Sequence, residues 1–173
     1  GHTPNRRVVP LADAVKRIEV AVEARRSSDF LIVARTDART VHGLDEALRR
    51  MEQYARAGAD ILFIESPESI EEMEVIGKSF DLPLVANMVE TGRTPVLTKE
   101  ELQRIGYGLA IFPSAAFLSA GAAFKNVYSH IKATGSSANL NQPLHDFQDF
   151  SKLMGFDWVA DFDKSHAAEA VTS

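Results

Sequence analysis

LIVARTDAR, residues 31–39, is a short apolar run that ends abruptly in an arginine, a hydroxyl and a carboxylate. Residues 31–34 have no polar face, which is typical of a strand buried on both sides. Arg35, Thr36 and Asp37 follow where such a strand would emerge into a loop, and the carboxyl ends of parallel strands are where α/β proteins place their chemistry. The triplet therefore predicts a functional site. A local ion pair between Arg35 and Asp37 that closes the loop is the alternative.

The same unit, an apolar run followed by a polar strand end, occurs four times along the chain. Strands are predicted at 30–34, 61–64, 83–86 and 109–112, with strand ends at Arg35, Glu65, Asn87 and Ser114. Apolar residues at steps of three and four predict helices at 10–27, 43–58, 69–80, 98–105 and 115–133. Capping boxes are predicted for two of these helices, at Ser69 with Glu72 and at Thr98 with Glu101.

Strands that alternate with helices imply a parallel sheet with right-handed crossovers. The choice is between an open doubly wound sheet and a (β/α)8 barrel. No G-x-G-x-x-G follows the first strand and no G-x-x-x-x-G-K-[ST] occurs, so two nucleotide-binding signatures are missing. Four units are half of eight, and a complete barrel needs about 250 residues. We therefore predict an α/β fold in which residues 1–134 form the second half of a (β/α)8 barrel.

The remaining residues, 135–173, are predicted as a linker, a helix and a frayed tail. The linker, GSSANLNQP, is polar and rich in turn residues. Phe147, Phe150, Leu153 and Met154 then form an apolar helical face. Docking of this helix on its own domain is the default, and docking on a neighbouring subunit is the sharper hypothesis.

Composition narrows the possible functions. The 173 residues, 45% of them hydrophobic, are enough for one domain with a sizeable core. A formal net charge of −5 and the lack of a dense Lys/Arg block argue against nucleic-acid binding, and the absence of cysteine excludes disulfides and thiolate metal sites within the chain. Neither an apolar run of about 18 residues nor a signal-peptide core occurs, so we expect no membrane association and a cytoplasmic location. Because no Met starts the chain, we expect a processed or truncated product.

Several motifs together resemble one family. The chain opens with Gly-His, ARTDA occupies 34–38, an Ile-Glu strand end lies at 64–65, and ANMVE-x-G-x-TP occupies 86–95. In this combination the chain resembles the isocitrate lyase / phosphoenolpyruvate mutase superfamily from residue 1 to about residue 156. Within it, the chain is similar to the carboxyphosphonoenolpyruvate mutase, methylisocitrate lyase and dimethylmalate lyase branch. The resemblance implies a (β/α)8 barrel whose last helix swaps onto a neighbouring subunit, in a homotetramer or other homo-oligomer.

The resemblance also implies roles for residues at the strand ends. Arg35 matches the arginine of ARTDA and would bind a substrate carboxylate, which a guanidinium recognises through two hydrogen bonds. Asn87 would donate a hydrogen bond to a substrate carboxylate. Glu65 matches a strand-end glutamate near the metal and its waters, and it is a candidate catalytic residue. Its alternative role is that of an ion-pair partner for Arg35 or Lys78.

Further positions follow from the same motifs. His2 matches the end of a K-K-C-G-H loop and is a second candidate catalytic residue. Glu90 and Ser114 are candidate substrate-binding residues, with loop support for Glu90 and helix capping for Ser114 as the alternatives. Thr94 and Pro95 match loop contacts beyond Glu90.

The chain departs from the family pattern at its start. The cysteine that is the general acid/base of these lyases would precede Gly1, and the carboxylates that hold the family's Mg2+ belong to the first half of the barrel. We therefore expect an N-terminal half of the barrel to be a partner that supplies them. The chain alone is expected to be inactive.

The resemblance implies that the complete protein cleaves a C–C bond of a small 2-hydroxy or 2-oxo carboxylate, of the methylisocitrate, dimethylmalate or oxaloacetate type. Mg2+ would stabilise the enolate that forms. Two alternatives are a P–C bond mutase or hydrolase of the same superfamily, and an inactive half-barrel that acts as a structural or interaction module. An unrelated phosphate-binding α/β protein ranks last, because the stretch after the fourth strand offers only Gly121, well inside a helix.

Overall fold

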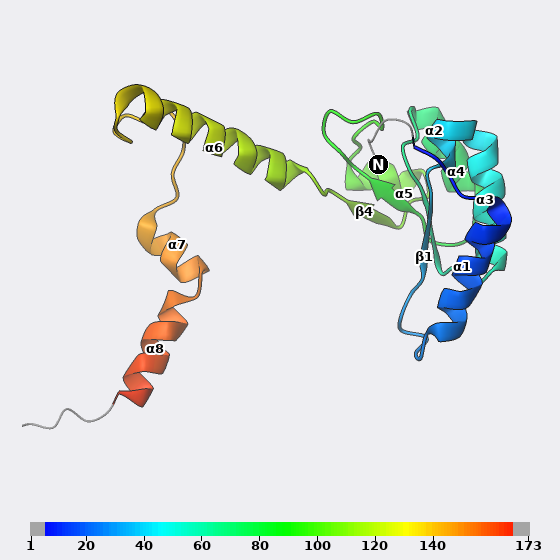
Figure 1. Cartoon of the computed structure of the whole chain (residues 1–173), viewed down its shortest axis with the longest axis horizontal. Coiled ribbons are helices and arrows are strands. Elements are labelled where there is room, and N and C mark those ends of the chain that lie inside the picture. The colour runs from blue at the N-terminus through cyan, green and yellow to red at the C-terminus, as the bar shows by residue number, and fades with distance from the viewer. Residues whose placement is uncertain (1–5, 168–173) are drawn as a thin grey trace, which may run out of the picture. The chain divides into compact units, whose positions relative to one another are not determined.

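The computed structural model describes residues 6–167. The chain divides into two compact units between Ser119 and Ala120. The first unit has α/β structure, and the described part of the second consists of helices and loops (Figure 1). The elements of the first unit are, in order, α1 (Leu11–Ala24), β1 (Val33–Thr36), α2 (Ala38–His42), α3 (Leu44–Arg56), β2 (Ile61–Ile64), α4 (Ile70–Ser79), β3 (Val85–Asn87), α5 (Lys99–Arg104) and β4 (Leu109–Ile111).

The four strands are parallel and follow the order of the chain. β1 pairs with β2, with Arg35 opposite Phe63, and β3 pairs with β4. A parallel bridge between Leu62 and Leu84 joins β2 to β3, and beside it the Leu62 N–H donates to the Pro83 carbonyl at 3.0 Å. A barrel wall follows chain order in this way, whereas a doubly wound sheet reverses its strand order. The described strands therefore favour the barrel alternative.

The core of the first unit lies between the sheet and the helices α3 and α4. Met51 of α3 and Met73 and Ile76 of α4 are almost fully buried, and so are Leu62 and Leu84 of the sheet. Burying a side chain of this size contributes about 1.5–3 kcal/mol. The apolar steps of three and four in the sequence predicted these helix faces. This packing holds the carboxyl ends of the strands in place.

The first strand differs from its prediction in two ways. β1 includes Arg35 and Thr36, because both continue the ladder with β2. Leu31 and Val33 are 53% and 48% exposed, so the prediction of a run buried on both sides is wrong. Side chains alternate across a strand. Ala34 and Thr36 are buried on one face, while Val33 and Arg35 are exposed on the other.

Local helix signals were partly correct. The short helix α2, which follows β1 directly, was not predicted. At α4, the Ser69 hydroxyl accepts from the Glu72 N–H at 3.2 Å, but the Glu72 carboxylate accepts from the Glu68 N–H, so the predicted capping box is only half formed. The box of Thr98 with Glu101 is confirmed in both of its hydrogen bonds.

Helix α6 (Ala115–Thr134) spans the division between the units, and the second unit continues with α7 (Phe147–Leu153) and α8 (Phe156–His166). The two last helices are separate because Gly155 between them adopts a left-handed φ of +84°. Large apolar side chains on both are exposed, including Phe147 at 83% and Trp158 at 69%. Within residues 6–167, no helix combines the length and apolar character that crossing a bilayer requires.

Candidate active site

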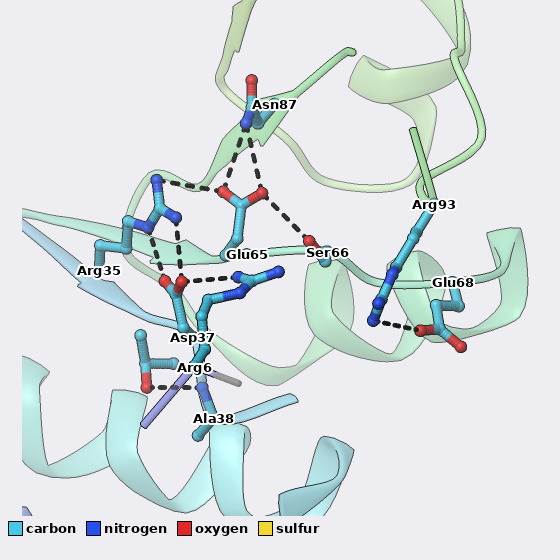
Figure 2. A network of polar contacts seen from close by, with 10 residues as sticks. Arg6, Arg35, Asp37, Ala38, Glu65, Ser66, Glu68, Asn87 and Arg93 are labelled. Atoms are coloured by element: carbon cyan, nitrogen blue, oxygen red, sulfur yellow. Dashed lines mark hydrogen bonds and ion pairs between the residues drawn. The ribbon is translucent and has the colours of Figure 1, made fainter. Parts of the chain in front are cut away.

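Polar side chains from three neighbouring strands meet at the carboxyl end of the sheet. Arg35 lies on β1, Glu65 follows β2 directly, and Asn87 is the last residue of β3. Figure 2 shows these three side chains pointing toward one another. Parallel strands in chain order bring their carboxyl ends to one edge, which is why residues far apart in sequence form one cluster.

The carboxylate of Glu65 is the centre of this cluster and is only 2% exposed. Arg35 Nη1 lies 3.3 Å from Oε2, and the Asn87 amide donates to Oε1 and Oε2 at 3.4 and 3.3 Å. Ser66 Oγ donates to Oε1 at 3.1 Å. A buried charge requires such partners. Of the two ion-pair partners predicted for Glu65, Arg35 is confirmed, whereas Lys78 lies instead 3.5 Å from Glu74.

Arg35 also binds Asp37 through a two-pronged contact. Nε donates to Oδ1 at 2.7 Å and Nη2 to Oδ2 at 3.1 Å, so the predicted local ion pair is present as well. The hydrogen bond with Asp37 raises the pKa of the Arg35 guanidinium above its ordinary value. The guanidinium lies 5.1 Å from the ring centroid of Phe63, its partner in the ladder. Asp37, Glu65 and Phe63 therefore all contact the guanidinium.

One edge of the Arg35 guanidinium remains available. A guanidinium has five N–H donors, and two of them donate to Asp37. Nη1 faces Glu65 without a well-formed hydrogen bond, and the second hydrogen of Nη2 has no acceptor within residues 6–167. The Nη1/Nη2 edge is the one that could bind an incoming carboxylate.

Sequence reasoning did not identify Ser66 as part of the cluster. Its φ of +59° lies in the left-handed region, which is uncommon for a residue other than glycine and costs about 1–3 kcal/mol. Its side chain is buried, and its hydroxyl points at Glu65 (Figure 2). No periodicity or motif marks this residue, because its role depends on a backbone angle.

A second pair lies at the ends of β3 and β4. Ser114 Oγ donates to Glu90 Oε2 at 3.0 Å, so these two predicted site residues contact each other. Thr94 lines a narrow pocket together with Ser66 and Asn87. His2, the other predicted catalytic residue, lies outside the described residues.

The described residues do not assemble a complete metal site, since no three His, Cys, Asp or Glu side chains gather among residues 6–167. They do offer oxygen atoms near the cluster. The carboxylate of Glu65 is buried, and Asn87 Oδ1 is buried without a hydrogen-bond partner in this part of the chain. Such oxygens suit the waters of a hydrated Mg2+, which usually keeps several of them.

The fold and the strand-end cluster identify the class of protein. Residues 1–132 match the phosphoenolpyruvate phosphomutase family, and the chain belongs to this family. The resemblance drawn from the GH, ARTDA and ANMVE motifs is thereby confirmed.

Several relatives of the chain are named as lyases. The chain is 41% identical over 167 residues to 2,3-dimethylmalate lyase of Eubacterium barkeri, a match that covers 96% of this chain and 58% of that enzyme. It is 38% identical over 156 residues to 2-methylisocitrate lyase of Aeropyrum pernix, covering 90% of this chain and 50% of that enzyme. The chain therefore spans between half and three fifths of the length of these relatives.

Solved structures agree with this assignment. Oxaloacetate acetylhydrolase in complex with the inhibitor 3,3-difluorooxalacetate superposes with a TM-score of 0.85 at 28% identity, covering 98% of this chain and 57% of that structure. Phosphonopyruvate hydrolase in complex with oxalate and Mg2+ superposes with a TM-score of 0.80 at 25% identity, covering 96% of this chain and 60% of that structure. The four-strand α/β unit is thus part of a fold that these enzymes share.

Proposed function

We propose that the chain forms the carboxylate-binding part of a Mg2+-dependent lyase that cleaves a C–C bond of a small 2-hydroxy or 2-oxo carboxylate. The observation that supports this most directly is the cluster of Arg35, Glu65 and Asn87 at three adjacent strand ends. The lyase names of the relatives support the class of reaction. Methylisocitrate, dimethylmalate and oxaloacetate are the types of substrate to test.

In this proposal each residue of the cluster has a separate task. Arg35 binds a substrate carboxylate through its Nη1/Nη2 edge, and Asn87 fixes a second polar oxygen of the substrate. Glu65, held by Arg35, Asn87 and Ser66, presents its carboxylate beside the reacting carbons and accepts hydrogen bonds from water. When bound beside Glu65 and Asn87, Mg2+ would supply Lewis-acid stabilisation of the negative charge that develops next to a carboxylate.

The remaining parts of the site come from outside the described residues. We propose that a further barrel portion pairs with the outer edges of β1 and β4 and supplies the metal ligands and the general acid/base. β1 pairs only with β2 and β4 only with β3 among the described strands. Phe112, directly after β4, is 52% exposed and Val33 of β1 is 48% exposed, which is compatible with such pairing.

The last helices suit the proposed swap onto a neighbouring subunit. α7 and α8 expose Phe147, Leu153 and Trp158, each by more than two thirds of its surface. Large apolar side chains that gather at a surface often mark protein–protein contacts. We therefore keep a homo-oligomer, with a homotetramer as its first candidate, as part of the proposal.

The test is a cleavage assay with Mg2+ on the chain alone and on the chain combined with the proposed further barrel portion, supplied in cis or in trans. Dimethylmalate, methylisocitrate and oxaloacetate are offered as C–C substrates, and phosphonopyruvate tests the P–C alternative. Activity of the combined protein on a C–C substrate, with loss in Arg35→Lys, supports the proposal. Cleavage of phosphonopyruvate alone favours the P–C alternative, and a combined, folded protein inert on all four favours the non-catalytic module.

A further inference from the structure

Asp37 occupies the N-cap position of α2, but its side chain does not cap the helix. Aspartate is a preferred N-cap because its carboxylate accepts from the first free N–H groups of a helix. Asp37 occupies this position before α2, yet its side chain makes no such hydrogen bond. The N–H of Ala38, the first residue of α2, donates to the hydroxyl of Thr36 at 3.2 Å. The carboxylate of Asp37 therefore has another role than local helix stabilisation.

That carboxylate lies between two arginines. It binds Nε and Nη2 of Arg35 on one side, and Arg6 Nη1 donates to Oδ2 at 2.7 Å on the other. Both partners are shielded, with the side chain of Arg6 11% exposed and that of Asp37 20%. Figure 2 shows Asp37 joined to both guanidinium groups, and Glu65 joined to another nitrogen of Arg35.

The contacts form one chain of alternating charge from Arg6 through Asp37 and Arg35 to Glu65. Arg6 lies 31 positions before Asp37, so the contact joins the segment ahead of α1 to the end of β1. Burial opposes ionisation of Asp37, but the hydrogen bonds from Arg35 and Arg6 outweigh it and hold the pKa of its carboxyl below the ordinary value. Asp37 thus stays charged at neutral pH.

We propose that Asp37 is a positioning residue for substrate binding, which sets the plane of Arg35 and is itself held by Arg6. The inference rests on the proposed function, because it assumes that Arg35 binds the substrate carboxylate. By occupying the Nε/Nη2 edge, Asp37 leaves only the Nη1/Nη2 edge for an incoming carboxylate. A planar carboxylate then binds in a single orientation.

The first experiment needs no substrate and uses the 173-residue chain labelled with 15N. Hydrogen exchange of the Arg35 Nε–H is followed by NMR, and the signal is identified by its loss in Arg35→Lys. We expect Asp37→Asn to speed this exchange by about 10- to 100-fold, because a charge-assisted hydrogen bond is lost. Asn remains a good N-cap, so α2 is preserved. Arg6→Gln should speed exchange by a smaller factor.

Asp60→Asn is the matched control. Asp60 binds Arg25 Nη1 at the same 2.7 Å and accepts from the Ile32 N–H. It directly precedes β2, and these partners do not include Arg35. The control should leave Arg35 Nε–H exchange unchanged. Exchange in Asp37→Asn as slow as in the wild type overturns the proposal, and so does an equal acceleration in Asp60→Asn.

The second experiment uses calorimetry to measure the affinity for oxalate in the presence of Mg2+. The sample is the chain combined with the proposed further barrel portion. We expect oxalate to bind about 10-fold or more weakly to Asp37→Asn than to the wild type, with Asp60→Asn unchanged. Equal affinity in the wild type and Asp37→Asn contradicts the positioning role. If the wild type itself does not bind oxalate, the proposed function fails, and the exchange experiment alone then decides whether Asp37 positions Arg35.

Discussion

Gly77 of α4 meets the backbone carbonyl of Ile105 so closely that a Cβ on Gly77 would overlap its oxygen. Gly106 approaches from the other side, where an added Cβ would lie 2.6 Å from the Gly77 oxygen. The end of α5 and the middle of α4 are therefore in direct backbone contact. This contact fixes the distance between the helices that follow β2 and β3.

Gly77→Ala is expected to destabilise the protein by about 1–3 kcal/mol, as overpacking of a close contact does. Chemical denaturation measures the free energy of unfolding. Gly121→Ala is the control, since that helical glycine has no atom within 4 Å of its added Cβ, and alanine there should stabilise by about 0.5–1 kcal/mol. Equal stability of Gly77→Ala and the wild type would show that the two backbones can separate freely.

Glu72→Gln is expected to lower stability at neutral pH and to matter less in acid. Arg39 donates to both Glu72 oxygens at 2.9 and 2.6 Å, and this hydrogen bonding holds the pKa of Glu72 below its ordinary value of 4.5. A carboxyl with a lowered folded-state pKa stabilises the fold above its unfolded-state pKa and loses this contribution as pH falls through the folded-state value. Denaturation at about pH 7 and about pH 3 should therefore show a deficit that shrinks on acidification. A deficit that is constant with pH would contradict this explanation.

Asn87→Asp should make the free energy of unfolding fall as pH rises, which is the opposite of the dependence expected for Glu72. The new carboxylate would lie beside Glu65, where the amide now lies 3.3 Å from Oε2, and like charges at this distance raise one of the two pKa values. A carboxyl whose pKa is raised in the folded state favours folding while it is protonated and opposes folding once it is ionised. The free energy of unfolding of the variant should therefore fall further below that of the wild type as pH rises from about 4 to about 7. Asn126→Asp, on the exposed surface of α6, should lack this trend, and an equal trend in both variants would argue against coupling to Glu65.

Trp158 reports on the proposed helix swap. It is the single tryptophan, 69% exposed on α8, and its ring lies 5.4 Å from that of Phe162. If α8 docks on a second subunit, acrylamide should quench Trp158 fluorescence strongly in dilute protein and weakly in concentrated protein. Phe147→Ser should move this change to higher concentration. Quenching that does not depend on concentration, together with a native mass of 19.0 kDa, would contradict the swap.

The positions of the strand ends could be predicted from the sequence, and so could the ion pairs of Arg35 with Asp37 and Glu65, but most of the other contacts could not. Arg35, Glu65, Asn87 and Ser114 each follow an apolar run, and parallel strands in chain order bring such residues to one edge. A side chain that could bind any of several partners binds the one that the folded structure brings closest. Glu72 illustrates this, because its carboxylate binds Arg39 and the Glu68 N–H and completes no capping box.

The same limit explains the contacts and residues that the sequence did not indicate. The ion pair of Asp37 with Arg35 could be predicted because the two residues are close in sequence, but the contact of Asp37 with Arg6, 31 positions away, has no local signal. Ser66 depends on a left-handed φ that no sequence pattern signals. The exposure of Val33 differs from its prediction because burial on the second face of β1 requires a covering element that the described residues do not include.

The chain of contacts from Arg6 to Glu65 has a consequence for the order in which ligands bind. Two guanidinium groups and two carboxylates lie in sequence, so their formal charges cancel. A free dicarboxylate that approaches these four residues meets the N–H donors of Arg35 but no net electrostatic attraction, because the long-range field depends on the summed charge. Its two negative charges must be balanced by a cation that arrives before it or with it. If the proposed function holds, we expect the cluster to bind a cation–dicarboxylate complex and to have weak affinity for the bare dianion.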